Sequence, residues 1–129
     1  MRKIWLYGFC LGILIIFSLV NISAQSCNTK DKASSKKMLR SLVNELKNGK
    51  IEAALKRFVP SEGTQKVLSE MSLKDRDVLI KGLKASKCFK QIKENYLIYL
   101  MPFGKGEEIL QLKMGIIKSE SGEWIIMYW

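Results

Sequence analysis

Residues 110–129, LQLKMGIIKSESGEWIIMYW, carry the clearest structural pattern in this chain of 129 residues. Apolar side chains fill every second position from Leu110 to Ile116, and the polar sequence SESG at 119–122 separates them from an apolar segment at 124–129. A period of two is typical of strands with one buried face, so these residues predict an antiparallel hairpin. The second strand is apolar on both parities. We therefore expect one of its faces to pack on helices and the other to be covered or to line a hollow.

The alternating pattern begins upstream of this hairpin, after Lys87. Residues 97–101, LIYLM, are apolar on both parities, and PFGKG at 102–106 is typical of a turn. We therefore expect an antiparallel meander of at least three strands.

The preceding half of the chain shows helical periodicity. One apolar stripe covers 39–46 and ends near Gly49, a residue typical of helix C-termini. A second stripe covers 51–59 and is stopped by Pro60. These patterns predict two short amphipathic helices joined by a tight link.

Two further helices are expected before the strands. The apolar residues within 67–71 suggest a short helix, and Ser72 followed by Asp75 resembles a capping box that opens another helix, which ends near Ser86. No strand is evident between the second and third helices, and the sequence leaves open whether one forms there. The fold class predicted is α+β, with N-terminal helices packed on a curved, cone-like antiparallel sheet of at least three strands.

The N-terminus has the three parts of a secretory signal peptide. Arg2 and Lys3 precede an apolar run at 4–20, and small and polar residues follow it. We interpret 1–24 as the signal peptide, 25–32 as a flexible polar lead and 33–129 as a single α+β domain. The signal places the domain outside the cytoplasm, in the periplasm or secreted.

Cys27 leaves an alternative open. A cut directly before it would have Ala24 and Ser26 at the −3 and −1 positions and would expose Cys27 for lipid modification, giving a lipid-anchored protein. In an oxidising compartment Cys27 and Cys88 could instead form a disulfide. The two outcomes exclude each other, because the sulfur of a lipidated cysteine is already a thioether.

The charge is strongly basic, with 22 Lys and Arg against 12 Asp and Glu. The excess is concentrated in 30–93, whereas 94–129 is slightly acidic. A solvated, lysine-rich surface is one interpretation, and weak contact with an anionic membrane surface is the other. Nucleic acid is not an expected partner, because the export signal directs the chain away from it.

The residue types exclude several chemistries. The chain has no histidine, which removes Ser-His and Cys-His nucleophile arrangements and histidine-ligated zinc. No cysteine pair has metal-finger spacing, and no glycine-rich phosphate loop precedes a helix. We therefore predict no metal, no cofactor and no catalytic residue. The aromatic residues crowd into the last third, where they form either core or a ligand pocket. The candidate pocket residues are Tyr96, Tyr99, Met114, Trp124 and Tyr128.

Two stretches carry a family resemblance. LRSLVNELKNGKIEAALKRFVP at 39–60 resembles the opening helix pair of the nuclear transport factor 2-like (cystatin-like) superfamily, and 110–129 resembles its closing hairpin. The resemblance extends to small exported bacterial domains, and it implies a curved sheet wrapped on helices with a pocket in the concavity. The Asp-His pair of some enzymatic members has no counterpart here.

Two functional hypotheses follow. The first is an exported, non-catalytic binding or interaction module with an apolar pocket on the curved sheet. Its partner would be a small amphipathic ligand, a protein, or a second copy in a homodimer formed through the sheet face. The alternative is a small enzyme of the same fold that uses a pocket tyrosine and a carboxylate.

Overall fold

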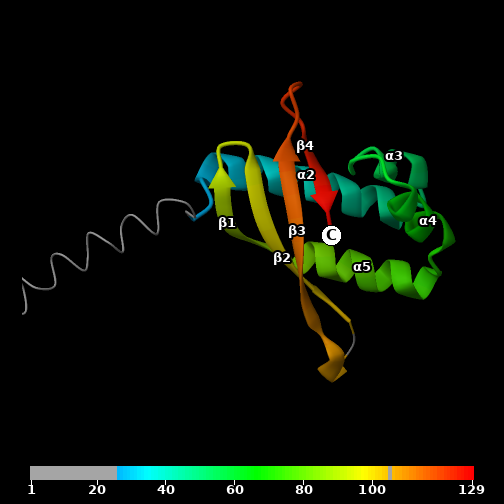
Figure 1. The fold of residues 1–129 in the computed structure, drawn as a ribbon. Helices are drawn as coiled ribbons and strands as arrows, with labels where there is room; N and C mark the ends of the chain where they lie inside the picture. Colours follow the sequence, from blue (N-terminus) through cyan, green and yellow to red (C-terminus); the bar gives the residue numbers. More distant parts are fainter. Residues whose placement is uncertain (1–25, 105) are drawn as a thin grey trace, which may run out of the picture.

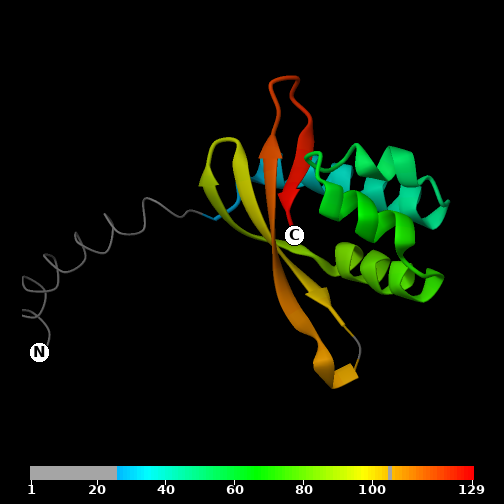
Figure 2. The same cartoon turned by 45° about the vertical axis from the view of Figure 1, so that its right-hand side comes forward.

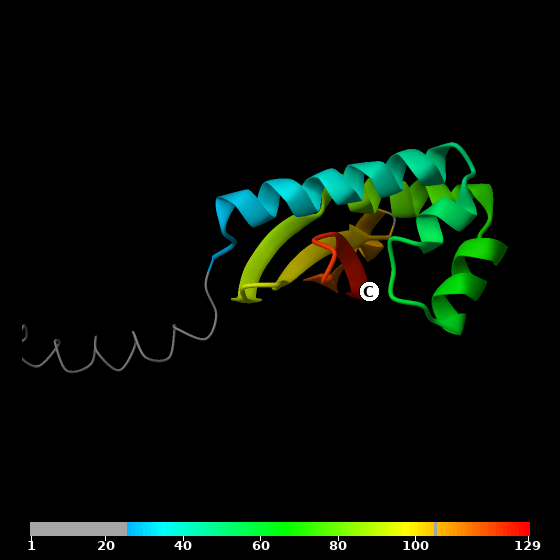
Figure 3. The same ribbon diagram turned by 90° about the horizontal axis from the view of Figure 1, so that it is seen from above.

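The structure is a computed structural model that describes residues 26–104 and 106–129, so the signal peptide expected at 1–24 lies outside the described residues. The elements are α2 (Thr29–Lys47), α3 (Ile51–Leu55), α4 (Glu62–Glu70), α5 (Leu73–Ala85), β1 (Lys87–Lys93), β2 (Tyr96–Phe103), the 3-10 helix η1 (Gly106–Glu108), β3 (Leu110–Lys118) and β4 (Trp124–Tyr128). The strands form one antiparallel sheet in the order β1-β2-β3-β4. Helices α2 and α5 lie against one face of this sheet (Figures 1 and 3). The predicted α+β class is confirmed, and β1 adds a fourth strand to the expected meander.

The segment expected to be a flexible lead is largely fixed to the domain. Helix α2 begins at Thr29, because the side chain of Asn28 accepts hydrogen bonds from the first turn, at 2.9 Å from the amide nitrogen of Lys30. The backbone N–H of Asn28 donates to Oε1 of Gln91 on β1 at 2.7 Å. A disulfide joins Cys27 to Cys88, with 6.3 Å between their Cα atoms. The expected boundary at residue 33 is therefore too late, since these tertiary contacts order the chain from Cys27 onward.

The link between α2 and α3 follows the sequence prediction. Gly49 has a φ of 71°, and the backbone N–H of Lys50 donates to the carbonyl of Glu45 at 2.9 Å. A positive φ is strained for residues with a Cβ, so glycine suits this helix end. Helix α3 is shorter than the predicted stripe at 51–59, because the chain leaves it to pair with the sheet.

That pairing answers whether a strand forms between the second and third helices. Phe58 makes an isolated parallel bridge with Ile126 of β4. The N–H of Val59 donates to the carbonyl of Ile126, and the N–H of Ile126 donates to the carbonyl of Arg57, both at 2.8 Å. One bridge covers part of the free edge of β4, which limits the unpaired backbone that this edge exposes.

The capping residue predicted for α5 is confirmed, since Oγ of Ser72 accepts from the N–H of Asp75 at 3.1 Å.

Side chains from the helices and from the inner face of the sheet form one core. Its buried members are Met38, Leu39, Leu42, Val43, Leu46, Ala54, Phe58, Leu68, Leu79, Ile80, Leu83, Leu97, Tyr99, Met101, Met114, Ile116, Trp124 and Ile126.

Close packing of α5 on β2 determines where the sheet leaves the helices. A Cβ added to Gly82 would lie 2.5 Å from the carbonyl oxygen of Pro102, so only glycine fits this approach. Beyond this point β2 and β3 continue past α5, and the connection that contains η1 projects from the body of the domain (Figure 2). Ile109 and Leu110 in this projection are exposed.

Candidate functional site

The five residues predicted to line a pocket are divided between the two faces of the sheet. Tyr99, Met114 and Trp124 are no more than 4% exposed and belong to the core beneath the helices. Tyr96 and Tyr128 lie on the opposite face. The structure therefore does not bring the five together.

A register shift explains why Trp124 and Tyr128 point in opposite directions. Regular alternation would place both on one face. Ile116 pairs with Ile126, but the next pair is Gly115 with Tyr128, so β4 holds one extra residue at this point. This β-bulge turns Tyr128 away from the helices, whereas Trp124 and Ile126 remain in the core.

We call the sheet surface turned away from the helices the outer face, and its side chains form three rows across the strands. Lys87, Leu100 and Lys113 form the first row. The second row is Lys90, Ile98, Gly115 and Tyr128, and the third is Lys93, Tyr96, Ile117 and Ile125. Each row begins with a lysine on β1 and continues with an apolar or aromatic residue on β2. Among the described residues, no helix or strand packs over this face (Figures 1 and 3).

Two tyrosines meet at the centre of the outer face. Their hydroxyl oxygens, from Tyr96 and Tyr128, are 3.2 Å apart. Gly115 lies between the two strands, and a Cβ there would overlap the ring of Tyr128. The ring therefore lies flat over β3, next to Ile98, which is only 7% exposed although it is outside the main core. The hydrogen bond with Tyr96, together with partial burial, raises the pKa of the Tyr128 hydroxyl.

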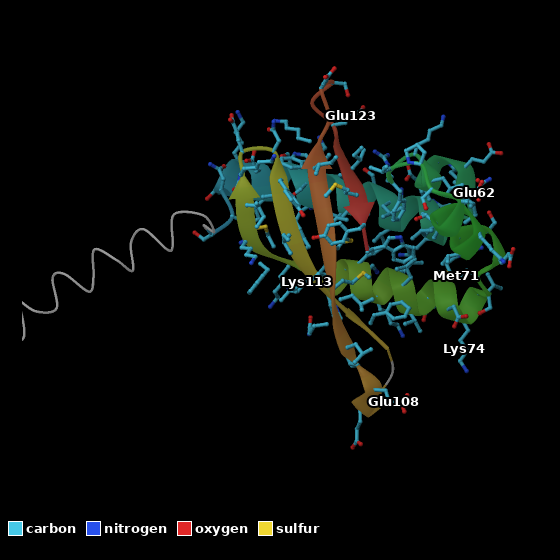
Figure 4. All side chains as sticks on the ribbon, in the orientation of Figure 1. Glu62, Met71, Lys74, Glu108, Lys113 and Glu123 are labelled. Carbon is cyan, nitrogen blue, oxygen red and sulfur yellow. A yellow bond between two sulfur atoms is a disulfide. The ribbon has the colours of Figure 1, made fainter. Side chains whose placement is uncertain are left out.

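All of the charged side chains on the four strands are positive. The four strands contain five lysines and no aspartate or glutamate. Lys113 lies partway along β3, whereas Glu108 and Glu123 lie in connections at the two ends of the sheet (Figure 4). The middle of the outer face is therefore a neutral, aromatic surface flanked by cations.

The lysines of β1 are the site residues that the sequence analysis missed. They recur every third residue, and in a regular strand Lys90 would lie on the face opposite Lys87 and Lys93. Two register shifts, one between Cys88 and Lys90 and one between Gln91 and Lys93, bring all three lysines to the outer face. The absence of acidic residues from the strands was the signal available in the sequence.

The inner aromatic residues have structural hydrogen bonds. The hydroxyl of Tyr99 lies 2.6 Å from Oγ of Ser35, and the indole N–H of Trp124 donates to Oγ of Ser34 at 2.8 Å. Burial raises the pKa of the Tyr99 hydroxyl, and its hydrogen bond with Ser35 partly offsets that effect. These contacts hold the N-terminal half of α2 on the sheet.

Two surface hollows lie away from the outer face. One, of about 700 Å³, borders the α2–α3 link, and in it Arg57 makes a two-pronged ion pair with Glu45, at 2.7 and 3.0 Å. The hydrogen bonds with Glu45 raise the pKa of Arg57 above its ordinary value, and the ion pair balances the charge of the guanidinium. The other, of about 620 Å³, lies between α5 and the projecting connection and includes Val78, Pro102 and Ile109. Neither hollow contains any of the five predicted pocket residues.

The part of the chain that the structure describes holds no group of three or more Asp, Glu, Cys or His side chains arranged to bind a metal ion. Within the same residues, no helix combines the length and hydropathy required to cross a membrane. Comparisons with known protein families, with curated proteins and with solved structures found no match to this chain.

Proposed function

We propose that this protein is an exported, non-catalytic interaction module that contacts its partner through the outer face. The observation that carries the proposal is the three-row arrangement, in which lysines flank Tyr96, Tyr128 and apolar side chains, and no helix or strand within 26–104 and 106–129 packs over them. Unpaired sheet faces with aromatic centres are typical of interaction surfaces. Membership of the nuclear transport factor 2-like superfamily remains a prediction that accords with this function.

The disulfide between Cys27 and Cys88 supports an extracytoplasmic location, because such bonds persist in oxidising compartments. The same bond argues against lipid modification of Cys27, since that sulfur has no free valence once it is oxidised. Intact mass of the protein from its native envelope distinguishes the two forms. A diacylglyceryl addition at Cys27 would contradict the disulfide-bonded, soluble form.

The catalytic alternative requires a tyrosine close to a desolvated carboxylate. The tyrosine hydroxyls with described contacts instead face other hydroxyls or a backbone carbonyl, as with Tyr99 and the carbonyl of Lys32 at 3.3 Å. A tyrosine in these surroundings has no partner to accept its proton. The described geometry therefore supports binding in preference to proton transfer.

Site-specific photo-crosslinking tests the proposal. We would replace Tyr128 with the photo-reactive aromatic residue benzoylphenylalanine in the full-length chain, irradiate cells that export it, and identify adducts by mass spectrometry. The matched control carries the same residue at Lys37, which is exposed on α2. We expect adducts from position 128 in excess of those from position 37. A protein adduct, a lipid adduct or a crosslinked dimer each supports an interaction surface, whereas no adduct at 128 refutes it.

A further inference from the structure

We infer that the outer face docks on an anionic phospholipid surface, with the helix layer turned away from the lipid. This inference rests on the proposed function and identifies the partner class for that same face. It follows from the shape of the face, from the distribution of its charges, and from the contrast with the basic surface of α2.

The shape of the outer face favours an extended partner. Small ligands are usually bound in concave sites that bury most of their surface. The two hollows described above lie elsewhere, beside α3 and beside α5, and neither includes a residue of the three rows. Another hollow, of about 590 Å³ beside the start of α2, includes Lys93 and no other residue of these rows. The outer face is the side of the curved sheet opposite the helices (Figure 3). Its central residues Tyr96, Ile98 and Tyr128 line none of these hollows, so the face suits a broad partner.

The charges favour a partner with many negative groups. Lys87, Lys93 and Lys113 are exposed, and Lys90 is half-buried beside the exposed ring of Phe89. Lysine side chains can lay their methylene groups along an apolar surface while the ammonium group reaches outward. Each lysine held near an anionic membrane strengthens binding by about fivefold. A layer of lipid phosphates complements four such cations at once.

The tyrosines favour lipid over an acidic protein as the source of these negative groups. Tyr128 is 38% exposed and lies flat at the centre, with its hydroxyl directed to Tyr96. Tyrosine is enriched at membrane–water interfaces, because its ring is apolar and its hydroxyl is polar. Leu100, Ile117 and Ile125 of the same rows are half-buried and add apolar surface.

The surface of α2 is also basic, but it does not combine cations with exposed apolar and aromatic side chains. Its exposed cations are Lys30, Lys32, Lys37, Arg40 and Lys47. Every large hydrophobic residue of α2 is buried in the core, whereas the outer face leaves Tyr128 exposed and other apolar and aromatic residues half-buried, namely Tyr96, Leu100, Ile117 and Ile125. The helix surface therefore offers only long-range electrostatic attraction. The outer face adds apolar and aromatic contact, and this difference decides the orientation.

The experiment measures co-sedimentation with phosphatidylcholine vesicles, with and without phosphatidylglycerol. The chain from Gln25 onward is suitable because the described core lies wholly within it and it omits the apolar run at 4–20. The test variant combines Lys87→Glu and Lys113→Glu, and the matched control combines Lys37→Glu and Arg40→Glu. Both pairs replace two exposed cations with two anions, so the net charge changes equally.

We expect wild-type binding only to the anionic vesicles, with loss of binding at about 1 M salt, where the screening length is about 3 Å. The sheet pair should weaken binding by about 25-fold or more, that is, about fivefold for each lysine. The Lys37→Glu/Arg40→Glu variant should bind within about threefold of wild type. It changes only the long-range electrostatic attraction and leaves the outer face intact. The milder pair Lys87→Gln and Lys113→Gln serves if the reversal variant does not fold.

Each remaining outcome has a definite meaning. Equal losses in both pairs would show attraction by net charge alone and would overturn the inference. Absence of wild-type binding to anionic vesicles would overturn it as well. If position 128 then crosslinks to a protein or to a second copy, the proposed function stands and only the lipid partner is wrong. If position 128 yields no adduct, the proposed function itself fails.

Discussion

Reduction of the disulfide between Cys27 and Cys88 should lower the free energy of unfolding by about 4 kcal/mol. The two cysteines are 61 positions apart. In the chain-entropy account, cross-links that close 15 and 100 residues contribute about 3 and 4.7 kcal/mol, so a loop of this length contributes about 4 kcal/mol. For a domain of this size, such a loss corresponds to a decrease in Tm of roughly 15–30 °C.

The native state should keep its structure after reduction. The loss of about 4 kcal/mol can therefore be calculated from the unfolded chain alone. The N–H of Asn28 still donates to Gln91, Nε2 of Gln91 still donates to Asp31 at 2.9 Å, and Ser35 still contacts Tyr99. These contacts hold the start of α2 on β1 and β2 without the sulfur bridge. The reduced protein therefore loses mainly the restriction on its unfolded chain.

Urea unfolding followed by tryptophan fluorescence, with and without dithiothreitol, measures the effect on the chain from Gln25 onward. The double variant Cys27→Ser/Cys88→Ser is the control. Its urea midpoint should match that of the reduced wild type and should not change when dithiothreitol is added. A change in unfolding free energy below about 1 kcal/mol would refute the reasoning, because it would mean that the bond does not restrict the unfolded chain. Agreement in midpoint shift between reduction and the double variant separates the disulfide from any effect of the serine side chains.

Three further predictions concern the core. Trp124→Ala should cost about 3–5 kcal/mol in urea unfolding, because removal of a side chain that is only 4% exposed leaves a cavity in the core and removes the indole hydrogen bond to Ser34, whereas Tyr128→Ala should cost less than half of that. Gly82→Ala should destabilise by about 1–2 kcal/mol although alanine favours helices, since its Cβ would meet the backbone carbonyl of Pro102, and a stabilised variant would show that α5 packs more loosely. Lys81→Ala on the same helix should stay within about 0.5 kcal/mol. Burial raises the pKa of Tyr99 above the ordinary value of 10.0, so the unfolded state loses this proton first and stability should fall as pH rises above 10. Urea midpoints compared between about pH 9 and 11 should show a smaller decrease for Tyr99→Phe than for wild type, and equal decreases would contradict this assignment.

Local signals in the sequence determined which elements form. Ser72 caps α5 because its hydroxyl needs only the N–H three residues later, and Gly49 ends α2 because its φ requires no tertiary partner. Alternation within 96–129 predicted β2, β3 and β4, since one buried face imposes a period of two on the sequence. These features depend on neighbours along the chain, so they could be predicted from the sequence.

Strand register decided the composition of the candidate site. Alternation counts residues along one strand and contains no information on where a partner strand holds an extra residue. The bulge beside Gly115 therefore separated Tyr128 from Trp124, although both had been assigned to one pocket. In the same way the two register shifts of β1 gathered three lysines that regular spacing would place on different faces.

The N-terminal boundary shows the same division between local and tertiary causes. The polar sequence from Asn28 indicated a flexible lead, because neither hydrophobic periodicity nor aromatic residues are present there. In the structure, Cys88 and Gln91, more than 60 residues away, hold Cys27 and Asn28 and allow α2 to begin at Thr29. The sequence by itself determined the four helices, the strands β2, β3 and β4, and the basic charge of this protein. The tertiary structure alone decided which side chains share the outer face, because that depends on contacts between strands that are distant in the chain.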